Sequence, residues 1–130
     1  MPSATAPSAF LSATAASMPS AVHAVLLDAM REERPIACTY QGHLREICPI
    51  MLGRTGLAEK ALVFQFGGAT SKGRLTKPDW KCFFLDEVSD AVLKDGSWRA
   101  GTEHSQSQHC MKMVEYDVNP NSPYNPAFKL

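Results

Sequence analysis

Seven residues near the middle of the chain, Lys60 to Phe66, constrain the fold more than any other stretch. They read KALVFQF, are apolar at nearly every position, and have glycines on both sides. A short apolar run of this kind is typical of a strand that is buried on both faces. We therefore expect a sheet in which other strands flank this run and further residues cover it.

Other β-prone runs lie on both sides of this strand. Residues 36–40 and 44–50 flank Gln41-Gly42-His43, and this spacing predicts a hairpin. Pro49 cannot donate a hydrogen bond to a neighbouring strand, so we expect it to end the pairing or to lie at a sheet edge. Residues 67–79 contain three glycines and a proline but few apolar side chains, which predicts a loop. Further strands are predicted over residues 80–85, 87–93 and 113–118.

A single helix precedes the strands. Ser20 is a suitable N-cap, and apolar residues recur at helical spacing at positions 22, 25, 26, 29 and 30. Pro35 disfavours helical backbone at the residue before it, so the helix is expected to span about residues 20–33. This order predicts the α+β class: one N-terminal amphipathic helix packed on a small antiparallel β-barrel or a strongly bent sheet of about five strands.

The two ends of the chain differ from this central part. Residues 1–19 are rich in Ala, Ser and Pro and resemble neither a secretory signal nor a transit peptide, so they predict a disordered tail. Met18-Pro19-Ser20-Ala21 repeats Met1-Pro2-Ser3-Ala4, which leaves Met18 as an alternative start of translation. We expect the folded domain to cover residues 20–118 and residues 119–130 to form an extended C-terminal tail.

The charge of the chain is balanced overall but unevenly distributed. The 13 basic and 13 acidic residues sum to zero. Residues 45–81 nevertheless hold seven basic and three acidic side chains, a local excess of four positive charges. A local basic face can hold a compact anion even on a neutral protein; alternatively, these side chains are simply solvated. The basic residues are Arg45, Arg54, Lys60, Lys72, Arg74, Lys77 and Lys81.

The four cysteines, Cys38, Cys48, Cys82 and Cys110, include no CxxC pair. Most of them lie in apolar runs, which predicts buried thiols in a reducing, cytoplasmic environment. His104 and His109 beside Cys110 are the one metal-like cluster, but their spacing is unsuited to tetrahedral ligation, so no metal site is expected. No apolar run approaches the roughly 20 residues that a membrane span requires.

Several residues follow one another in an order that is known from a protein family. Tyr40 ends the first predicted strand, Arg45 and Pro49 lie in the second, and residues 81–88 read KCFFLDEV. In this order residues 22–93 resemble the WYL-domain family, small Sm-like β-barrels of bacterial transcription regulators and phage-defence proteins. The stretch from Gln65 through two glycines to a tryptophan is similar to short WYL-like proteins that have no DNA-binding domain.

The chain departs from the family pattern at three places. The signature tripeptide reads Lys60-Ala61-Leu62, without its Trp and Tyr, and the late run has Lys81 and Glu87 where the family has arginines. WYL domains are thought to hold nucleotide or nucleic-acid ligands with clustered Tyr and Arg side chains. Lys81 keeps only a point charge, Glu87 reverses the sign, and Arg45 keeps the planar guanidinium that suits phosphate. The resemblance therefore implies a modified anion site.

These observations predict a ligand-binding or regulatory module and not an enzyme. The chain has no GxSxG, HExxH or GxxxxGK[ST] motif. The expected ligand is a nucleotide or a short single-stranded nucleic acid, without a cofactor; aromatic residues would stack on it and basic residues would neutralise its phosphates. The candidate ligand-binding residues are Tyr40, Arg45, Lys72, Arg74, Trp80 and Lys81. Alternatively, the chain is a ligand-less protein-interaction or homodimerisation module that uses the apolar strand 62–66.

Overall fold

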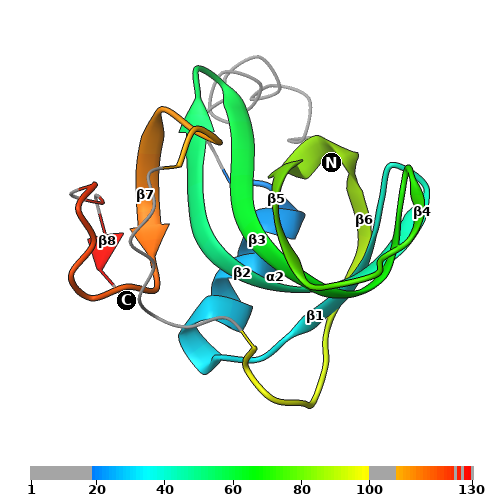
Figure 1. Ribbon diagram of the computed structural model, residues 1–130. Helices are drawn as coiled ribbons and strands as arrows, with labels where there is room; N and C mark the ends of the chain where they lie inside the picture. Colours follow the sequence, from blue (N-terminus) through cyan, green and yellow to red (C-terminus); the bar gives the residue numbers. More distant parts are fainter. Residues whose placement is uncertain (1–18, 100–107, 125, 127, 130) are drawn as a thin grey trace, which may run out of the picture.

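The computed structural model describes residues 19–99, 108–124, 126, 128 and 129. One helix packs on a strongly curled antiparallel sheet that forms a half-barrel (Figure 1), so the predicted α+β class is confirmed. In chain order the elements are α2 (Ala21–Glu32), β1 (Ile36–Tyr40), β2 (His43–Thr55), β3 (Ala58–Thr70), β4 (Gly73–Arg74), β5 (Asp79–Phe84), the 3-10 turn η1 (Leu85–Glu87), β6 (Val88–Leu93), β7 (Met113–Asp117) and β8 (Phe128–Lys129).

Helix α2 begins where the sequence predicts. The hydroxyl of Ser20 accepts a hydrogen bond from the backbone N–H of His23 at 3.2 Å, which caps the first turn. The helix ends at Glu33, whose φ of 53° is left-handed, two residues before the proline. Leu26 and Met30 lie on the buried side of the helix, which packs against β2, β6 and η1.

Strands β1 and β2 form the predicted hairpin. Tyr40 pairs with His43, and the two residues between them have positive φ angles, 51° at Gln41 and 81° at Gly42. Two consecutive left-handed residues are typical of the tight hairpin turn whose twist matches that of the strands. Arg45 is the third residue after Gly42 and pairs with Cys38, so the hairpin brings it within two residues of the end of β1.

The prediction that Pro49 ends the pairing or lies at an edge is confirmed on one side of β2 and wrong on the other. Strand β2 continues through Pro49, which pairs with Val63 of β3. The other side of β2 pairs with β1 up to Ile47 and with β7 from Met51 onward. Pro49 lies between these two partners and beside a register shift in the pairing with β3, and such local edges and bulges are where a strand tolerates proline.

Two bulges curl the sheet. Between β2 and β3 the register shifts so that Phe66 has no counterpart on β2, and a second shift leaves Ile50 without a counterpart on β3. An extra residue bends its strand and increases the local twist. Strand β3 also pairs with β5, so the curl carries β5 round toward the end of β1 (Figure 1).

The loop predicted over residues 67–79 is shorter in the structure. Strand β3 continues to Thr70 and turns back into β4, which pairs with it through Ala69 and Arg74. The strand continues because Gly68, at φ +88°, adopts a backbone that few other residues tolerate and faces Arg45 of β2 without a side chain between them. This hairpin end projects beside the open edge of the half-barrel (Figure 1).

Burial of β3 differs from the prediction. On the concave side Ala61, Val63 and Gln65 are fully buried, whereas Leu62 and Phe64 on the other side are only half-buried. The strand is therefore buried on one face and partly covered on the other. The one polar residue on its buried face, Gln65, lies in the core at 0% exposure.

The last strands close the described part of the chain. Strand β7, predicted over residues 113–118, pairs with β2, and the two-residue β8 pairs with β7 in parallel. Strand β8 lies in the segment for which the sequence predicts an extended tail. The predicted N-terminal tail, apart from residue 19, lies outside the described residues.

Candidate anion-binding pocket

A pocket of about 340 Å³ opens on the concave side of the sheet, between the end of β1, the β3–β4 hairpin and β5. Four of the six predicted site residues line it: Tyr40, Arg45, Lys72 and Lys81. The remaining lining residues are Gln41, Thr70, Ser71, Cys82, Phe83 and Phe84. The fold thus brings together side chains that are up to 44 positions apart, from Tyr40 to Phe84.

Arg45 forms the base of the pocket. Its residue is only 4% exposed, and its Nη1 donates to Oε1 of Gln65 at 3.1 Å while its Nη2 lies 3.4 Å from the Tyr40 carbonyl oxygen. The guanidinium carbon lies 5.2 Å from the centre of the Tyr40 ring and 5.5 Å from that of Phe83. Cation–π attraction and two neutral acceptors therefore hold this cation in place.

No described carboxylate forms an ion pair with Arg45. Its Nε is buried and has no hydrogen-bond partner among the residues that the structure describes. Burial lowers the pKa of Arg45, because the charged form loses its hydration. A buried cation without an anionic partner carries a desolvation cost that a bound anion would reduce.

Gln65 and the two glycines after it fix the position of Arg45. The Gln65 side-chain nitrogen donates to the carbonyl oxygens of Gly67 and Ala69 at 2.9 and 3.0 Å, which leaves its oxygen free to accept from Arg45. Gly68 pairs directly with Arg45 across the ladder. The Gln65 side chain thus links the irregular end of β3 to the Arg45 guanidinium.

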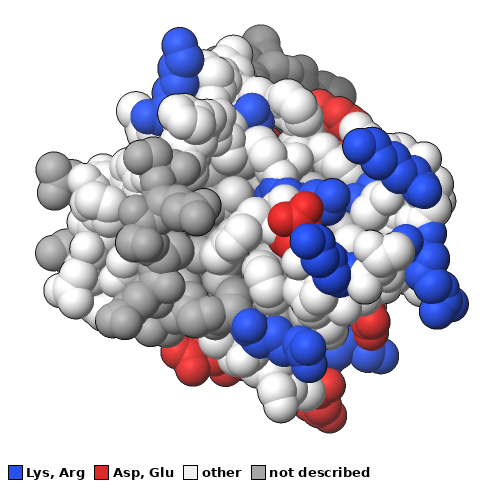
Figure 2. Space-filling model, in the orientation of Figure 1, with Lys and Arg blue, Asp and Glu red and all other residues white. Residues whose placement is uncertain are grey.

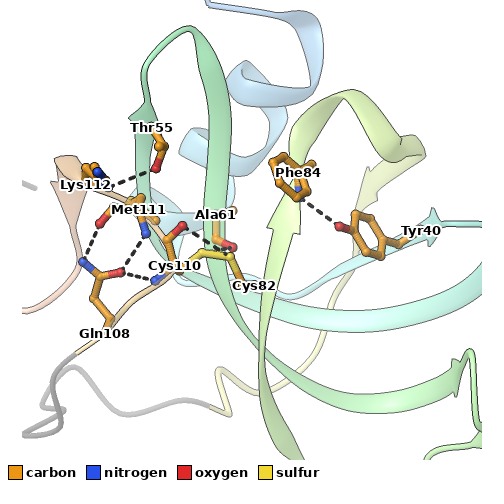
Figure 3. Close-up of a disulfide and its surroundings, with 9 residues drawn as sticks. All are labelled: Tyr40, Thr55, Ala61, Cys82, Phe84, Gln108, Cys110, Met111 and Lys112. Atoms are coloured by element: carbon orange, nitrogen blue, oxygen red, sulfur yellow. Dashed lines mark hydrogen bonds between the residues drawn. A yellow bond between two sulfur atoms is a disulfide. The ribbon is translucent and has the colours of Figure 1, made fainter.

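Tyr40 does not have the role predicted for it. Its ring stacks face to face on Phe83, with centroids 3.8 Å apart and planes at 4°, and the residue is 5% exposed. Its hydroxyl accepts a hydrogen bond from the backbone N–H of Phe84 at 3.0 Å (Figure 3). Burial is the largest cause that raises the pKa of Tyr40, so the phenol stays protonated. With one face covered, the ring forms a wall of the pocket and does not offer a free surface for a base.

Two lysines lie at the rim of the pocket. Lys72 comes from the tip of the β3–β4 hairpin, and Lys81 from β5, where its Nζ lies 3.8 Å from a carboxylate oxygen of Asp79. In the view of Figure 2, Lys and Arg side chains gather over the half of the visible surface that β3, β4 and β5 form, with a few acidic side chains among them. Glu87 accepts a hydrogen bond from the side chain of Gln41 at 2.7 Å and adds negative charge near one rim.

Arg74 and Trp80 do not line the pocket. Arg74 lies exposed on β4, where it pairs with Ala69. Trp80 lies on the opposite side of β5 from Lys81, as strand alternation requires, and its ring meets Phe64 edge to face at 5.2 Å. The prediction that Trp80 stacks on the same ligand as Arg45 has no support in this geometry.

Sequence reasoning missed Gln65 and Phe83 as parts of the site. Gln65 is the one internal polar residue of an otherwise apolar strand interior, and such a residue needs a buried hydrogen-bond partner. That pattern was a usable signal for a polar group beneath the pocket. Phe83 gave no such signal, because an aromatic residue in a strand is most simply explained as core.

The cysteines differ from the prediction. Cys82 and Cys110 form a disulfide (Figure 3), whereas Cys38 and Cys48 are buried thiols outside any disulfide. The expectation that Cys82 is a buried thiol is therefore wrong. Cys110 cannot serve as a thiolate metal ligand while it is in the disulfide, and His104, which belongs to the cluster where no metal site is expected, lies outside the described residues.

Comparison of the chain with protein-family models, with curated proteins and with solved structures found no match. Within the described residues, no helix has the length and apolar character needed to cross a membrane.

Proposed function

We propose that this protein is a ligand-binding module that holds a small phosphate-bearing anion, such as a nucleotide, in the pocket above Arg45. The observation that carries the proposal is the buried guanidinium. Arg45 is 4% exposed, has no carboxylate partner among the described residues, and has a buried Nε without an acceptor. Forming such an arrangement costs stability unless an anion completes it.

The lining of the pocket suits a phosphate more than a carboxylic acid or an apolar ligand. A guanidinium presents parallel donors to two phosphate oxygens, and Lys72 and Lys81 add positive charge on either side. Thr70 and Ser71 contribute hydroxyl-bearing residues at the hairpin tip. The aromatic residues Tyr40, Phe83 and Phe84 form an apolar wall for the remainder of the ligand.

The size of the pocket favours a compact ligand. About 340 Å³ lies at the lower end of the range for small-molecule sites, roughly 300 to 1,000 Å³. A mononucleotide has suitable dimensions, whereas a single strand would place only one phosphate or one terminus inside. The proposed ligand class is therefore a mononucleotide or another small phosphorylated compound, and a short single strand is a weaker candidate.

The family context belongs to this proposal. A helix followed by a curled antiparallel sheet is compatible with an Sm-like, WYL-like domain, and Tyr40 and Arg45 occupy one pocket, as the resemblance implies. A regulatory role in transcription or phage defence and a cytoplasmic location are the parts of the proposal that depend on this resemblance.

The alternative function, an interaction or homodimerisation module, relies on the outer side of β3. That surface is partly covered by the chain itself: Arg99 lies over the Phe66 ring at 5.2 Å, and Trp80 meets Phe64. The pocket residues have defined hydrogen bonds and ring contacts around Arg45, which favours the pocket over this surface as the functional site. Light scattering of the purified protein tests the alternative directly, since it requires a stable dimer or partner complex.

A thermal-denaturation screen tests the proposal. The probes are inorganic phosphate, mono-, di- and cyclic nucleotides, and short single-stranded RNA and DNA, each at low salt and at about 200 mM salt. A ligand that binds only the folded state raises the unfolding midpoint by mass action. We expect mononucleotides to raise it at both salt concentrations, because a partly enclosed pocket is screened less than an exposed surface.

Two matched variants assign any binding to the pocket. Arg45→Met removes the buried charge while keeping much of the side-chain volume, and Arg74→Met removes an exposed charge outside the pocket. We expect Arg45→Met to weaken mononucleotide affinity by about 30-fold or more, equivalent to about 2 kcal/mol. Arg74→Met should change it by about twofold, as a screened surface charge does. Equal effects of the two variants would show that binding is nonspecific charge attraction.

A further inference from the structure

The disulfide ties one wall of the pocket to a distant segment of the chain. Cys82 is the middle residue of the β5 stretch from Lys81 to Phe83 and itself contributes to the pocket lining. Its partner Cys110 lies 28 positions later, in the segment that leads into β7. Figure 3 shows the bond crossing from β5 to this segment beside β3.

Strand β5 is held by β3 along all six of its residues and by the Phe83 ring, which stacks on Tyr40. Among the described strands it pairs with β3 alone, so its outer edge is open. The Tyr40 hydroxyl holds the end of the strand through the N–H of Phe84. The disulfide is the covalent restraint in the middle of the strand, next to the two residues that face Arg45.

The segment around Cys110 has its own anchors. Oε1 of Gln108 accepts hydrogen bonds from the backbone N–H groups of Cys110 and Met111 at 2.8 and 3.0 Å (Figure 3). The Gln108 N–H in turn donates to the Tyr124 hydroxyl at 2.8 Å, and the N–H of Lys112 donates to the Arg54 carbonyl oxygen at 3.1 Å. These hydrogen bonds hold the segment independently of the disulfide.

The two sulfurs differ in accessibility. Cys82 is an exposed residue, whereas Cys110 is 6% exposed, so an attacking thiolate reaches the Cys82 sulfur first. The other two cysteines, Cys38 and Cys48, are buried. Exchange is therefore confined to one bond, without rearrangement among the four cysteines.

We infer that the Cys82–Cys110 disulfide is a reversible redox control of the anion pocket, with the oxidised form binding the phosphate-bearing ligand more tightly. The inference rests on the proposed function and specifies how that site is regulated. In the cytoplasm, where a disulfide is typically transient and redox-sensing, cellular thiols are the reductant. Reduction removes the covalent restraint at Cys82 and gives the neighbouring rim residue Lys81 more freedom to move relative to Arg45, while Phe83 stays stacked on Tyr40.

The chemistry is thiol–disulfide exchange. The thiolate of a small-molecule thiol attacks the Cys82 sulfur, the Cys82–Cys110 bond breaks, and Cys110 leaves as a thiolate that takes a proton from solvent. A second thiol then attacks the mixed disulfide and releases Cys82 as a thiol. In total, two thiols are oxidised to one disulfide and the protein gains two electrons and two protons.

The experiment compares AMP affinity, by isothermal titration calorimetry, in the oxidised protein, after reduction with dithiothreitol, and after re-oxidation. Mass spectrometry after alkylation under denaturing conditions counts the thiols, which in the oxidised form are those of Cys38 and Cys48. We expect reduction to weaken AMP affinity by about fivefold or more, and re-oxidation to restore it. Cys82→Ser should bind as the reduced protein does and lose its response to the reductant, whereas Cys38→Ser should retain the response.

The outcomes separate the inference from the proposed function. Equal AMP affinity in the oxidised and reduced forms would overturn the redox inference and leave the anion pocket intact. If no phosphate-bearing probe binds the oxidised protein, the proposed function fails and the inference fails with it. Amide hydrogen exchange tests whether the disulfide restrains β5. Reduction should accelerate exchange over residues 79–84, and unchanged exchange there would contradict such a restraint.

Discussion

Replacing Gly68 by alanine should destabilise the domain far more than the same change at another glycine of positive φ. Gly68 has a φ of +88°, and a Cβ added there would lie 2.8 Å from the Cα of Arg45 and overlap the carbonyl oxygen of Leu44. Both atoms belong to the backbone of β2, so no side-chain rotation relieves the overlap. Gly42 offers the matched control, because its φ is +81° and nothing lies within 4 Å of the added Cβ.

The structure gives the magnitude of each effect. The left-handed backbone costs a residue with a Cβ about 1–2 kcal/mol, and this cost applies to both variants. At Gly68 the strands must also separate where Gly68 pairs with Arg45, which weakens one or two ladder hydrogen bonds of about 1 kcal/mol each and loosens the packing around them. We expect Gly68→Ala to lower the free energy of unfolding by about 3–5 kcal/mol and Gly42→Ala by about 1–2 kcal/mol.

Urea denaturation followed by circular dichroism measures both values, since the midpoint and slope yield the free energy of unfolding. A difference of less than about 0.5 kcal/mol between the variants would refute the close approach of β3 and β2 at this point. Where Gly68→Ala still folds, AMP affinity should also fall, because the displaced backbone carries Arg45. Gly42→Ala should leave the affinity unchanged.

Three smaller perturbations test other parts of the structure. Tyr40→Phe keeps the stack on Phe83 but leaves the Phe84 N–H without its acceptor, so unfolding free energy from urea titration should fall by about 1 kcal/mol; no change would contradict the hydrogen bond. Ser20→Ala removes the helix cap and should cost about 1 kcal/mol in the same assay, whereas a neutral result would argue against the cap. Burial lowers the pKa of His23 below its ordinary value of 6.5, so the unfolded chain binds a proton where the folded chain does not. Unfolding free energy should therefore fall between about pH 7.5 and pH 6, and less steeply in His23→Gln; parallel pH profiles would contradict this.

Local signals in the sequence identify most of the secondary structure. The N-cap at Ser20, the turn at Gln41-Gly42 and the apolar run in β3 are each determined by a few neighbouring residues, and each lies where it was predicted. The errors at Pro49 and at residues 67–79 have a different origin. Whether a proline is tolerated depends on which strands flank it, and whether a glycine pair forms a loop or a bulge depends on the strand opposite.

The site was predictable where local sequence signals were enough. Arg45 and Lys81 were found from residue type and order, and the pocket brings them together. Trp80 was misplaced because the sequence did not show which side of β5 faces the half-barrel; a shift of one residue reverses every side chain of a strand. Pairing of Cys82 with Cys110 depends on the path of the segment before β7, which no local pattern indicates.

The central claim is that Arg45 contacts the bound anion, and nitrogen-15 NMR of the arginine Nε–H groups during an AMP titration tests it most directly. The Arg45 Nε has no partner among the described residues, and the spectrum of Arg45→Met identifies its signal. The proposed site predicts a saturable shift of the Arg45 signal, with the Arg74 signal nearly unchanged. A shift confined to Arg74, or none at either arginine, would contradict the assignment of this pocket as the anion site.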